Sequence, residues 1–298
     1  MELKQENKVI ETKIKTKSEL NIELQANIDK FINVKVNKKD LKNINYLNFI
    51  LQENNFYHFQ LLWPNIKVQE KDDDIFKLNF NFKNNSKTVF YILFKKSNHH
   101  FLNLRLEENS SVELFLINIH DYNIDLTING ELLGEKSNLN IYSLSVLQNS
   151  TKNQYINVIH KGNNSNANII NSDLCLGENT IKNRIINIVP ANIRFCSSHQ
   201  VIKCLNFDKK SIINNEPILG VYNNDVKCSH GCAVGDINLN EFIYLFSRGF
   251  SKQEIKKMLT LGYSVEILKN LYDIKIETKI LQSLKKTINK FFNEKKDK

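Results

Sequence analysis

Apolar and polar residues alternate with a period of two from about Asp74 onward. Over 76–82, four apolar residues are separated by lysine and asparagine, which is typical of a β-strand with one buried face. Short runs of this kind recur as far as about Val226, and Val89–Phe94 is apolar at every position. The pattern predicts a series of short strands with no helix-length segment between them.

Asparagine, serine and glycine dominate the segments between the predicted strands. We expect turns at 108–111, 129–130, 148–150 and 161–166, because asparagine tolerates a left-handed backbone and caps its own chain. Short strands at near-regular spacing fit a sandwich or barrel, or a parallel β-helix with stacked turns. Asn129-Gly130 is the only Asn-Gly hairpin signal in this stretch, which slightly favours the solenoid.

The N-terminal flank has a different pattern. Glu19–Asn33 shows rough helical spacing, so we expect 1–73 to be a small, partly helical region. The strand pattern then defines a β core over 74–236, which we expect to be a β-helix core if the solenoid interpretation holds, and the remaining segment, 237–298, forms a separate module. The fold class is therefore mainly β.

Helical periodicity replaces the strand pattern after about Ile237. A first amphipathic helix is expected to end before Gly249, a natural left-handed C-terminal residue. Ser251 and Glu254 form a capping box that starts a second helix, and Ile274–Phe292 reads as a third amphipathic helix. The sequence therefore predicts a C-terminal α-helical module.

The net charge of +9 comes almost entirely from lysine. The arginines, Arg105, Arg184, Arg194 and Arg248, are dispersed along the chain. Recognition of bases and phosphates favours the planar fork of arginine, so we expect no nucleic-acid partner. The abundance of asparagine, isoleucine and lysine is interpreted as a coding bias.

Cysteine usage and the apolar runs indicate the compartment. The cysteines are Cys175, Cys196, Cys204, Cys228 and Cys232, with no CxxC or zinc-finger spacing. The N-terminal segment is polar and lacks the apolar stretch of a secretory signal. The longest apolar run is far shorter than the ~20 residues that cross a bilayer. We expect a soluble intracellular protein with reduced thiols and no membrane contact.

Candidate chemistry is concentrated in 225–235, which reads DVKCSHGCAVG. In an extended strand, residues two apart share a face, so Cys228, His230 and Cys232 should point the same way. Thiolate and imidazole ligands suit iron, iron–sulfur clusters or zinc. The outer Cα atoms would lie ~13 Å apart, so one chain supplies a partial site that a partner could complete. Two buried strand cysteines and a satisfied histidine are the competing interpretation.

The sequence contains only weak signals for other kinds of active or binding site. A cysteine protease would need a histidine base such as His120, His160 or His199, and nothing local marks any of them. A β-helical carbohydrate-active enzyme would need paired carboxylates, for which Asp121 and Asp125 are the best candidates. The chain has no GxxxxGK[ST] or GxGxxG motif, so we expect it to bind no nucleotide.

The segment 216–235 resembles the signature of SufD subunits in the SufB/SufD family. The similarity continues through 242–249, which reads FIYLFSRG, and into the predicted helix over 251–268. SufB subunits lack the Cys-Ser-His-Gly run found at 228–231, which favours SufD. Two departures are Cys232, where the family usually has alanine, and the short chain, for which we expect a trimmed N-terminal region and fewer turns.

The resemblance implies a right-handed parallel β-helix flanked by helical regions, within a SufBCD complex for iron–sulfur cluster assembly. It implies a SufB-like subunit paired through the β-helix and a SufC-like ATPase docked on the C-terminal helices. His230 would lie at the SufB interface and help to hold a transient iron–sulfur cluster or iron shared with that partner, with Cys228 beside it. The chain itself would be no enzyme.

Two alternatives remain beside this hypothesis. One is a purely structural β-helical partner subunit without a ligand role, and the other is the carbohydrate-active enzyme. We expect a cytoplasmic location, or a plastid-type organelle if the gene is organelle-encoded.

Overall fold

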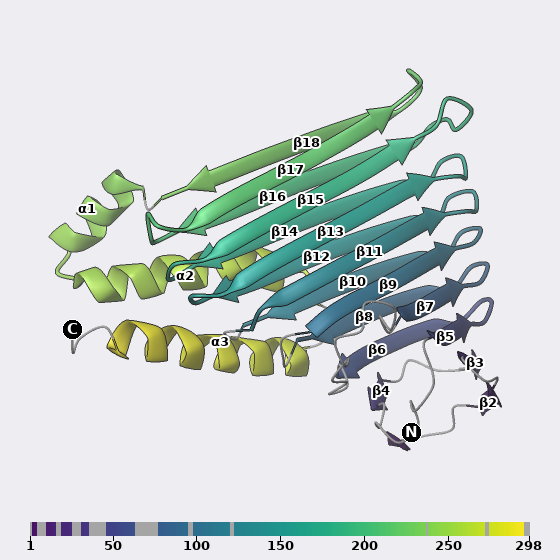
Figure 1. The fold of residues 1–298 in the computed structure, drawn as a ribbon, viewed down its shortest axis with the longest axis horizontal. Helices are drawn as coiled ribbons and strands as arrows, with labels where there is room; N and C mark the ends of the chain where they lie inside the picture. Colours follow the sequence, from purple (N-terminus) through teal and green to yellow (C-terminus); the bar gives the residue numbers. More distant parts are fainter. Residues whose placement is uncertain are drawn as a thin grey trace.

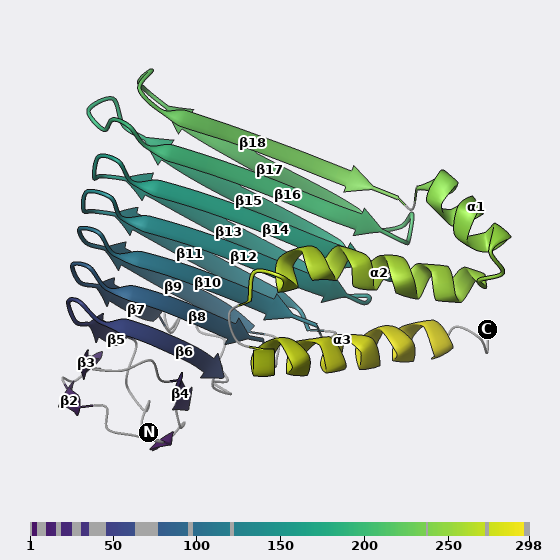
Figure 2. The ribbon, with the colours of Figure 1, turned by 180° about the vertical axis from the view of Figure 1, so that it is seen from behind.

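The computed structural model describes residues 2–4, 10–15, 19–25, 31–35, 46–62, 77–94, 98–119, 122–236, 238–271 and 274–294. Within them, eighteen strands are followed by three helices. Figures 1 and 2 show the strands stacked along one direction, with two helices lying along one side of the stack and the third beside its last strands.

The strands form two nine-stranded sheets, here called sheet A and sheet B. Sheet A contains, in spatial order, β1 (Glu2–Lys4), β4 (Phe31–Lys35), β6 (Phe56–Leu62), β8 (Lys87–Leu93), β10 (Ser111–Asn118), β12 (Asn138–Leu147), β14 (Asn166–Cys175), β16 (Ser197–Asn206) and β18 (Lys227–Gly235). Sheet B contains, in spatial order, β17 (Ile212–Val221), β15 (Thr180–Val189), β13 (Thr151–His160), β11 (Ile124–Leu132), β9 (Asn98–Leu106), β7 (Lys77–Phe82), β5 (Tyr46–Leu51), β3 (Glu19–Gln25) and β2 (Ile10–Lys15).

From β3 onward, consecutive strands alternate between the sheets, and neighbours within each sheet are parallel, apart from the antiparallel pairs β1–β4 and β2–β3. The chain is therefore a parallel β-solenoid, and the predicted solenoid is confirmed over the sandwich or barrel. Residues in register on successive turns are 24 apart between Lys77 and Phe101 and 32 apart between Thr180 and Ile212. Because the number of residues per turn varies, no fixed repeat is visible in the sequence.

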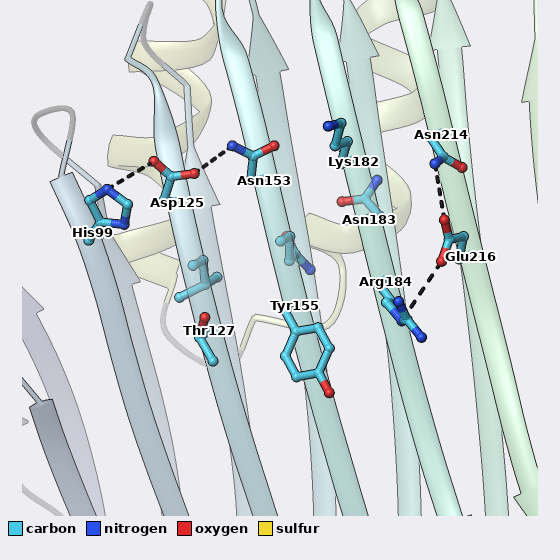
Figure 3. Close-up of a pocket in the computed structure, with 12 residues that line it drawn as sticks. His99, Asp125, Thr127, Asn153, Tyr155, Lys182, Asn183, Arg184, Asn214 and Glu216 are labelled. Atoms are coloured by element: carbon cyan, nitrogen blue, oxygen red, sulfur yellow. Dashed lines mark hydrogen bonds and ion pairs between the residues drawn. The ribbon is translucent and has the colours of Figure 1, made fainter. Parts of the chain in front are cut away.

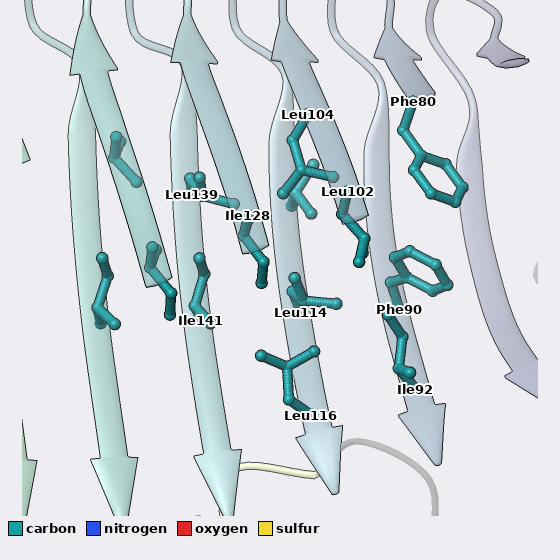
Figure 4. Packing of buried hydrophobic residues seen from close by; sticks show 14 of the residues in the cluster. Phe80, Phe90, Ile92, Leu102, Leu104, Leu114, Leu116, Ile128, Leu139 and Ile141 are labelled. Carbon is teal, nitrogen blue, oxygen red and sulfur yellow. The ribbon is translucent and has the colours of Figure 1, made fainter. Parts of the chain in front are cut away.

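The core lies between the two sheets. Phe80, Leu104, Leu114 and Ile141 belong to one cluster of buried apolar side chains that face inward from both sheets (Figure 4). The alternation of apolar and polar residues places every second side chain in this space. Burial of apolar area at about 25 cal/mol per Å² is the main force that holds the turns together.

The outer face of sheet A is covered by helices. The helices are α1 (Leu239–Ser247), α2 (Lys252–Leu268) and α3 (Ile274–Glu294). Side chains of α2 and α3 pack against outward-facing Tyr91, Phe115 and Tyr142 in a second apolar cluster, and Figure 2 shows the two helices across this face. Strand β8 is thus buried on both sides, which explains why Val89–Phe94 is apolar throughout.

The three predicted helices are confirmed. Ser251 accepts a hydrogen bond from the Glu254 backbone, and the Glu254 carboxylate accepts one from the Ser251 backbone, which completes the predicted capping box of α2. Gly249 has a φ of +90° directly after α1. That backbone conformation is open to glycine and unfavourable for most other residues.

Two sequence predictions are wrong. The described parts of Glu19–Asn33 are strands and not helix, because β3 and the beginning of β4 lie in it. Strand β3 pairs in parallel with β5, and β5 pairs with β7, so sheet B continues on the N-terminal side of residue 74. Leu20, Ile22 and Leu24 alternate at period two, and this pattern prevails over the helical spacing once a neighbouring strand is present.

The second wrong prediction is the turn at Asn129-Gly130, which lies inside β11. A Cβ at Gly130 would approach Leu139 Cδ2 to 2.9 Å, so glycine makes room for close packing in the core. The other turns follow the expected chemistry, since their asparagines have positive φ: Asn54, Asn85, Asn109, Asn149 and Asn164.

Asparagine also stacks on the outer face of sheet B. The Asn79 amide donates to Asn48, Asn103 donates to Asn79, and Asn129 donates to Asn103, at 2.6, 2.7 and 3.1 Å. Residues in register on neighbouring parallel strands lie about 4.8 Å apart, so identical amides can form a ladder. The high asparagine content, interpreted from the sequence as coding bias, therefore has a structural role here.

Candidate functional site

The solenoid ends on two unpaired strand edges. Strands β17 and β18 are the last of sheet B and sheet A, and both stand at the same end of the stack (Figure 1). Apolar side chains are exposed at this end and on the adjoining helix α1: Ile212, Val221, Tyr222, Val234, Leu239, Ile243, Tyr244 and Phe246. A long exposed edge with apolar side chains is a template for pairing with another chain.

The candidate ligands lie on β18. Cys228, His230 and Cys232 are in register with Ser198, Gln200 and Ile202 of β16. These three β16 residues are fully buried between the sheets, so the β18 side chains also face the inside, as the predicted common face requires. His230 and Cys232 are exposed, because no further turn of the described chain lies beyond β18.

Cys228 is the least accessible of the three. Its side chain packs against Val189, Ile193 and Cys196 at the corner of the last turn. Burial, and then the neighbouring Cys196 thiol, raise the pKa of Cys228 above its usual range. In the chain alone the thiol is therefore neutral, and a nearby cation would have to displace its proton before it could act as a ligand.

The described chain does not complete a metal site by itself. Within the described residues, no group of three or more His, Cys, Asp or Glu side chains is arranged to hold a metal ion. Cys228 and His230 are two donors of a type that suits iron or an iron–sulfur cluster. They lie at an uncovered end, where a second chain could supply the others.

Polar residues fill the solenoid interior below this end. Asn183, Asn187 and Gln200 are buried amides of the last turns, and each has a side-chain oxygen with no hydrogen-bond partner among the described residues. Deeper inside, Lys152 pairs with Asp173. The period-two pattern of the sequence showed that these positions face inward but gave no signal that the apolar core changes to a polar interior near β18.

The other cysteines are buried and free. Cys175 and Cys204 lie with their sulfur atoms 3.5 Å apart. The hydrogen bond between Cys204 and Cys175, together with burial, raises the pKa of Cys204, so this thiol is neutral and unreactive. Cys196 contacts the hydroxyl of Ser165 at 3.2 Å.

Two of the three histidines considered as protease bases can be located. His160 is fully buried and its Nδ1 lies 2.8 Å from Ser165 Oγ, while burial lowers its pKa to about 4. His199 Nδ1 lies 2.7 Å from Ser229 Oγ on the outer face of sheet A. His120 lies outside the described residues. Neither described histidine contacts a cysteine in these interactions, so the protease interpretation gains no support.

A polar groove of about 520 Å³ crosses the outer face of sheet B. Figure 3 shows Asp125 between His99 and Asn153, and Glu216 between Arg184 and Asn214. His99 Nε2 lies 3.5 Å from Asp125, and the Asn153 amide donates to Asp125 at 2.6 Å. Asp121, the other member of the predicted acidic pair, lies outside the described residues. The carboxylates of the groove are thus engaged by neighbouring side chains.

The C-terminal helices differ in how much surface they leave open. Helix α1 has no buried residue, and its Leu239, Ile243 and Phe246 are each more than half exposed. Helix α3 instead buries its apolar face against sheet A. Among the helices of the described segments, none is both long and apolar enough to cross a lipid bilayer.

Comparison with known proteins gives a family match over the larger part of the chain. Residues 78–263 match the family described as "SUF system FeS cluster assembly, SufBD core domain". The matched segment runs from strand β7 into helix α2 and contains the whole Cys-Ser-His-Gly run. Most of the solenoid and the candidate site therefore lie inside the family's core domain.

Three curated relatives align with shorter segments. The chain is 27% identical over 153 residues to the iron-sulfur cluster assembly protein SufD of Escherichia coli (strain K12). This alignment covers 51% of this chain and 36% of that protein. It is 31% identical over 81 residues to a SufBD family protein of Synechocystis, covering 27% of this chain and 18% of the relative. A SufBD family protein of Mycobacterium leprae is 27% identical over 116 residues, or 38% of this chain and 13% of the relative. The alignments thus span well under half of each relative.

Proposed function

Because the chain belongs to the SufBD core-domain family of the SUF iron–sulfur cluster assembly system, we propose that it is a SufD-type scaffold subunit. In this role it contributes His230 and Cys228 to a transient iron–sulfur cluster, or to iron, that it shares with a SufB-like subunit. The observation that carries the proposal is the inward-facing row of Cys228, His230 and Cys232 on an unpaired edge strand.

The geometry supports a site shared between two subunits rather than one formed by this chain alone. Cys228 and His230 occupy adjacent inward positions of β18, and within the described chain no group of three or more His, Cys, Asp or Glu side chains is arranged to hold a metal ion. A SufB-like solenoid that pairs with β17 and β18 would cover the open end and bring its own ligands over His230. Such pairing satisfies the free backbone groups of both edges and buries their apolar side chains.

Docking of a SufC-like ATPase is proposed for the C-terminal helices. The exposed apolar side chains of α1 offer a surface that a groove of the ATPase could bury. ATP binding by that subunit would shift the interface at β18 and open the site for loading. This chain binds no nucleotide in the proposal, hydrolyses nothing, and acts in the cytoplasm or a plastid-type organelle without nucleic-acid or membrane partners.

Co-purification followed by anaerobic iron and sulfide loading tests the proposal. The chain, a SufB-like subunit and a SufC-like ATPase are expected to co-elute, and His230→Ala should lower the iron and sulfide bound per complex without loss of assembly. His199→Ala, on the outer face of the neighbouring strand, is the matched control and should load as the wild type does. Failure of the three chains to co-elute would contradict the scaffold role.

A purely structural subunit is the second candidate function. It is favoured by the raised pKa of Cys228 and by the incomplete donor set of the described chain. In that case the complex would assemble normally, and His230→Ala and Cys228→Ala complexes would bind as much iron and sulfide as the wild type.

A further inference from the structure

Gln200 lies directly beneath His230 in the solenoid. The two residues are in register on the neighbouring parallel strands β16 and β18, which places their backbones about 4.8 Å apart. Gln200 is fully buried, whereas His230 is exposed at the open end. Both side chains face the inside, so the glutamine amide lies on the same inner face of sheet A as the imidazole, one strand below it.

The hydrogen bonding of Gln200 is half complete. Its Nε2 donates to the backbone oxygen of Ile218 at 2.9 Å. A carbonyl oxygen can only accept, so this bond fixes which end of the amide faces β17. The other end, Oε1, is buried and has no hydrogen-bond partner among the described residues. A buried acceptor without a partner is unfavourable because it has lost its hydrogen bonds to water, so a donor at this position would be stabilising.

The same two strands show that such a bond is within reach. On the outer face, His199 and Ser229 are also in register, and His199 Nδ1 lies 2.7 Å from Ser229 Oγ. An imidazole on one of these strands can therefore contact a polar atom of its register partner through Nδ1. On the inner face of β16, Gln200 is the residue in register with His230, whereas Ser198 and Ile202 are in register with Cys228 and Cys232.

We propose that Gln200 is the positioning residue of His230. Its Oε1 accepts a hydrogen bond from Nδ1–H of the imidazole, which selects one tautomer and turns the Nε2 lone pair toward the open end. Histidines that bind metals commonly donate their other ring N–H to such an acceptor, which fixes the ring and raises its basicity. The inference rests on the proposed function only in taking iron or a cluster as the group that Nε2 meets.

The tautomer of His230 can be measured without any metal. In the full-length chain labelled with ¹⁵N-histidine, at about pH 8.5, where free imidazole is neutral, the His230 resonances should show mainly Nδ1–H. Gln200→Met keeps the volume and removes the acceptor, so the population should shift to the Nε2–H form that free imidazole prefers. Asn187→Leu is the matched control, because Asn187 is also a buried amide with an unpartnered oxygen but is in register with Leu219.

Each outcome decides the inference. A Nδ1–H majority that is lost in Gln200→Met and kept in Asn187→Leu supports it. A wild-type His230 that is mainly Nε2–H overturns it, even if the methionine variant fails to fold, and so does a folded Gln200→Met chain with an unchanged tautomer.

Metal binding separates this inference from the proposed function. With Co²⁺ as the probe, the assembled complex carrying Gln200→Met should bind about 10–100-fold more weakly than the wild type, the range typical of a lost partner behind a histidine ligand. If the tautomer depends on Gln200 but the complex binds Co²⁺ and cluster equally well with and without His230, the positioning role stands and the proposed ligand role of His230 fails.

Discussion

Lys152 and Asp173 form an ion pair inside the solenoid, with the Lys152 Nζ 2.6 Å from a carboxylate oxygen of Asp173 and both side chains excluded from solvent. Asn171 and Asn183 donate to the second carboxylate oxygen at 2.8 and 2.7 Å. Removing one partner would leave an uncompensated buried charge. Lys152→Met is therefore expected to lower the free energy of unfolding by about 3–5 kcal/mol, measured by urea denaturation.

The double variant Lys152→Met/Asp173→Leu is the control for this prediction. Because it removes both charges from the interior, it should recover much of the stability that Lys152→Met loses. A double variant that is as unstable as the single one would show that the loss comes from packing rather than from the unpaired carboxylate.

The stability of the chain should depend on pH through His160. Burial lowers the pKa of this imidazole from 6.5 to about 4, so below pH 6.5 the unfolded chain takes up a proton that the folded chain does not. The part of the unfolding free energy that depends on His160 is fully present above pH 6.5, the unfolded pKa. It falls by about 3 kcal/mol as the pH drops from about 6.5 to about 4. Urea denaturation at pH 7 and pH 5 measures it.

His160→Leu is the matched variant, since Leu132 occupies the register position on the turn below. Its unfolding free energy should fall less between pH 7 and pH 5 than that of the wild type. Equal losses in the two proteins would mean that other groups, such as carboxylates, account for the acid sensitivity.

Gly162 should tolerate no side chain. A Cβ at this position would lie 2.1 Å from the backbone oxygen of Gly134 on the turn below, and backbone cannot move aside as a flexible side chain can. Gly162→Ala is expected to destabilise the chain by about 1–3 kcal/mol, seen as a lower melting temperature. Gly262→Ala in α2 is the control: nothing lies within 4 Å of its Cβ position, and alanine should stabilise the helix by up to about 1 kcal/mol.

A charge on the edge of β18 should weaken partner association without unfolding the chain. Val234 is half exposed in this strand, so Val234→Lys should change the stability of the chain alone by less than about 0.5 kcal/mol. If a partner buries the Val234 side chain, Val234→Lys removes about 1.5–3 kcal/mol of binding free energy. A SufB-like subunit should then bind at least about tenfold more weakly, as measured by calorimetry.

Leu133→Lys provides the comparison, because Leu133 is an exposed apolar residue that follows β11, and strands β13 and β15 lie between β11 and the terminal strand β17 of sheet B. It should bind the partner as the wild type does. Equal affinities for the Val234→Lys and wild-type chains would place the interface somewhere other than this edge.

Local sequence patterns were sufficient to predict the strand series from about residue 74, the three C-terminal helices and the common face of Cys228, His230 and Cys232. These features depend on local chemistry: period-two alternation sets the buried face of a strand, the capping box starts α2, and asparagine accepts the left-handed turn. The Cys-Ser-His-Gly run also carried the family resemblance, which the match over 78–263 confirms.

Which residues become neighbours across the turns could be seen only in the folded chain. The helical spacing of Glu19–Asn33 gave way to strands, because parallel pairing with β5 and β6 supplies hydrogen bonds that an isolated segment lacks. Gln200 came to lie under His230 because the intervening turn returns the chain in register after 30 residues. Local sequence patterns do not encode that return distance, since turn lengths vary along the solenoid, and so the polar interior and the open end appeared only once the turns were stacked.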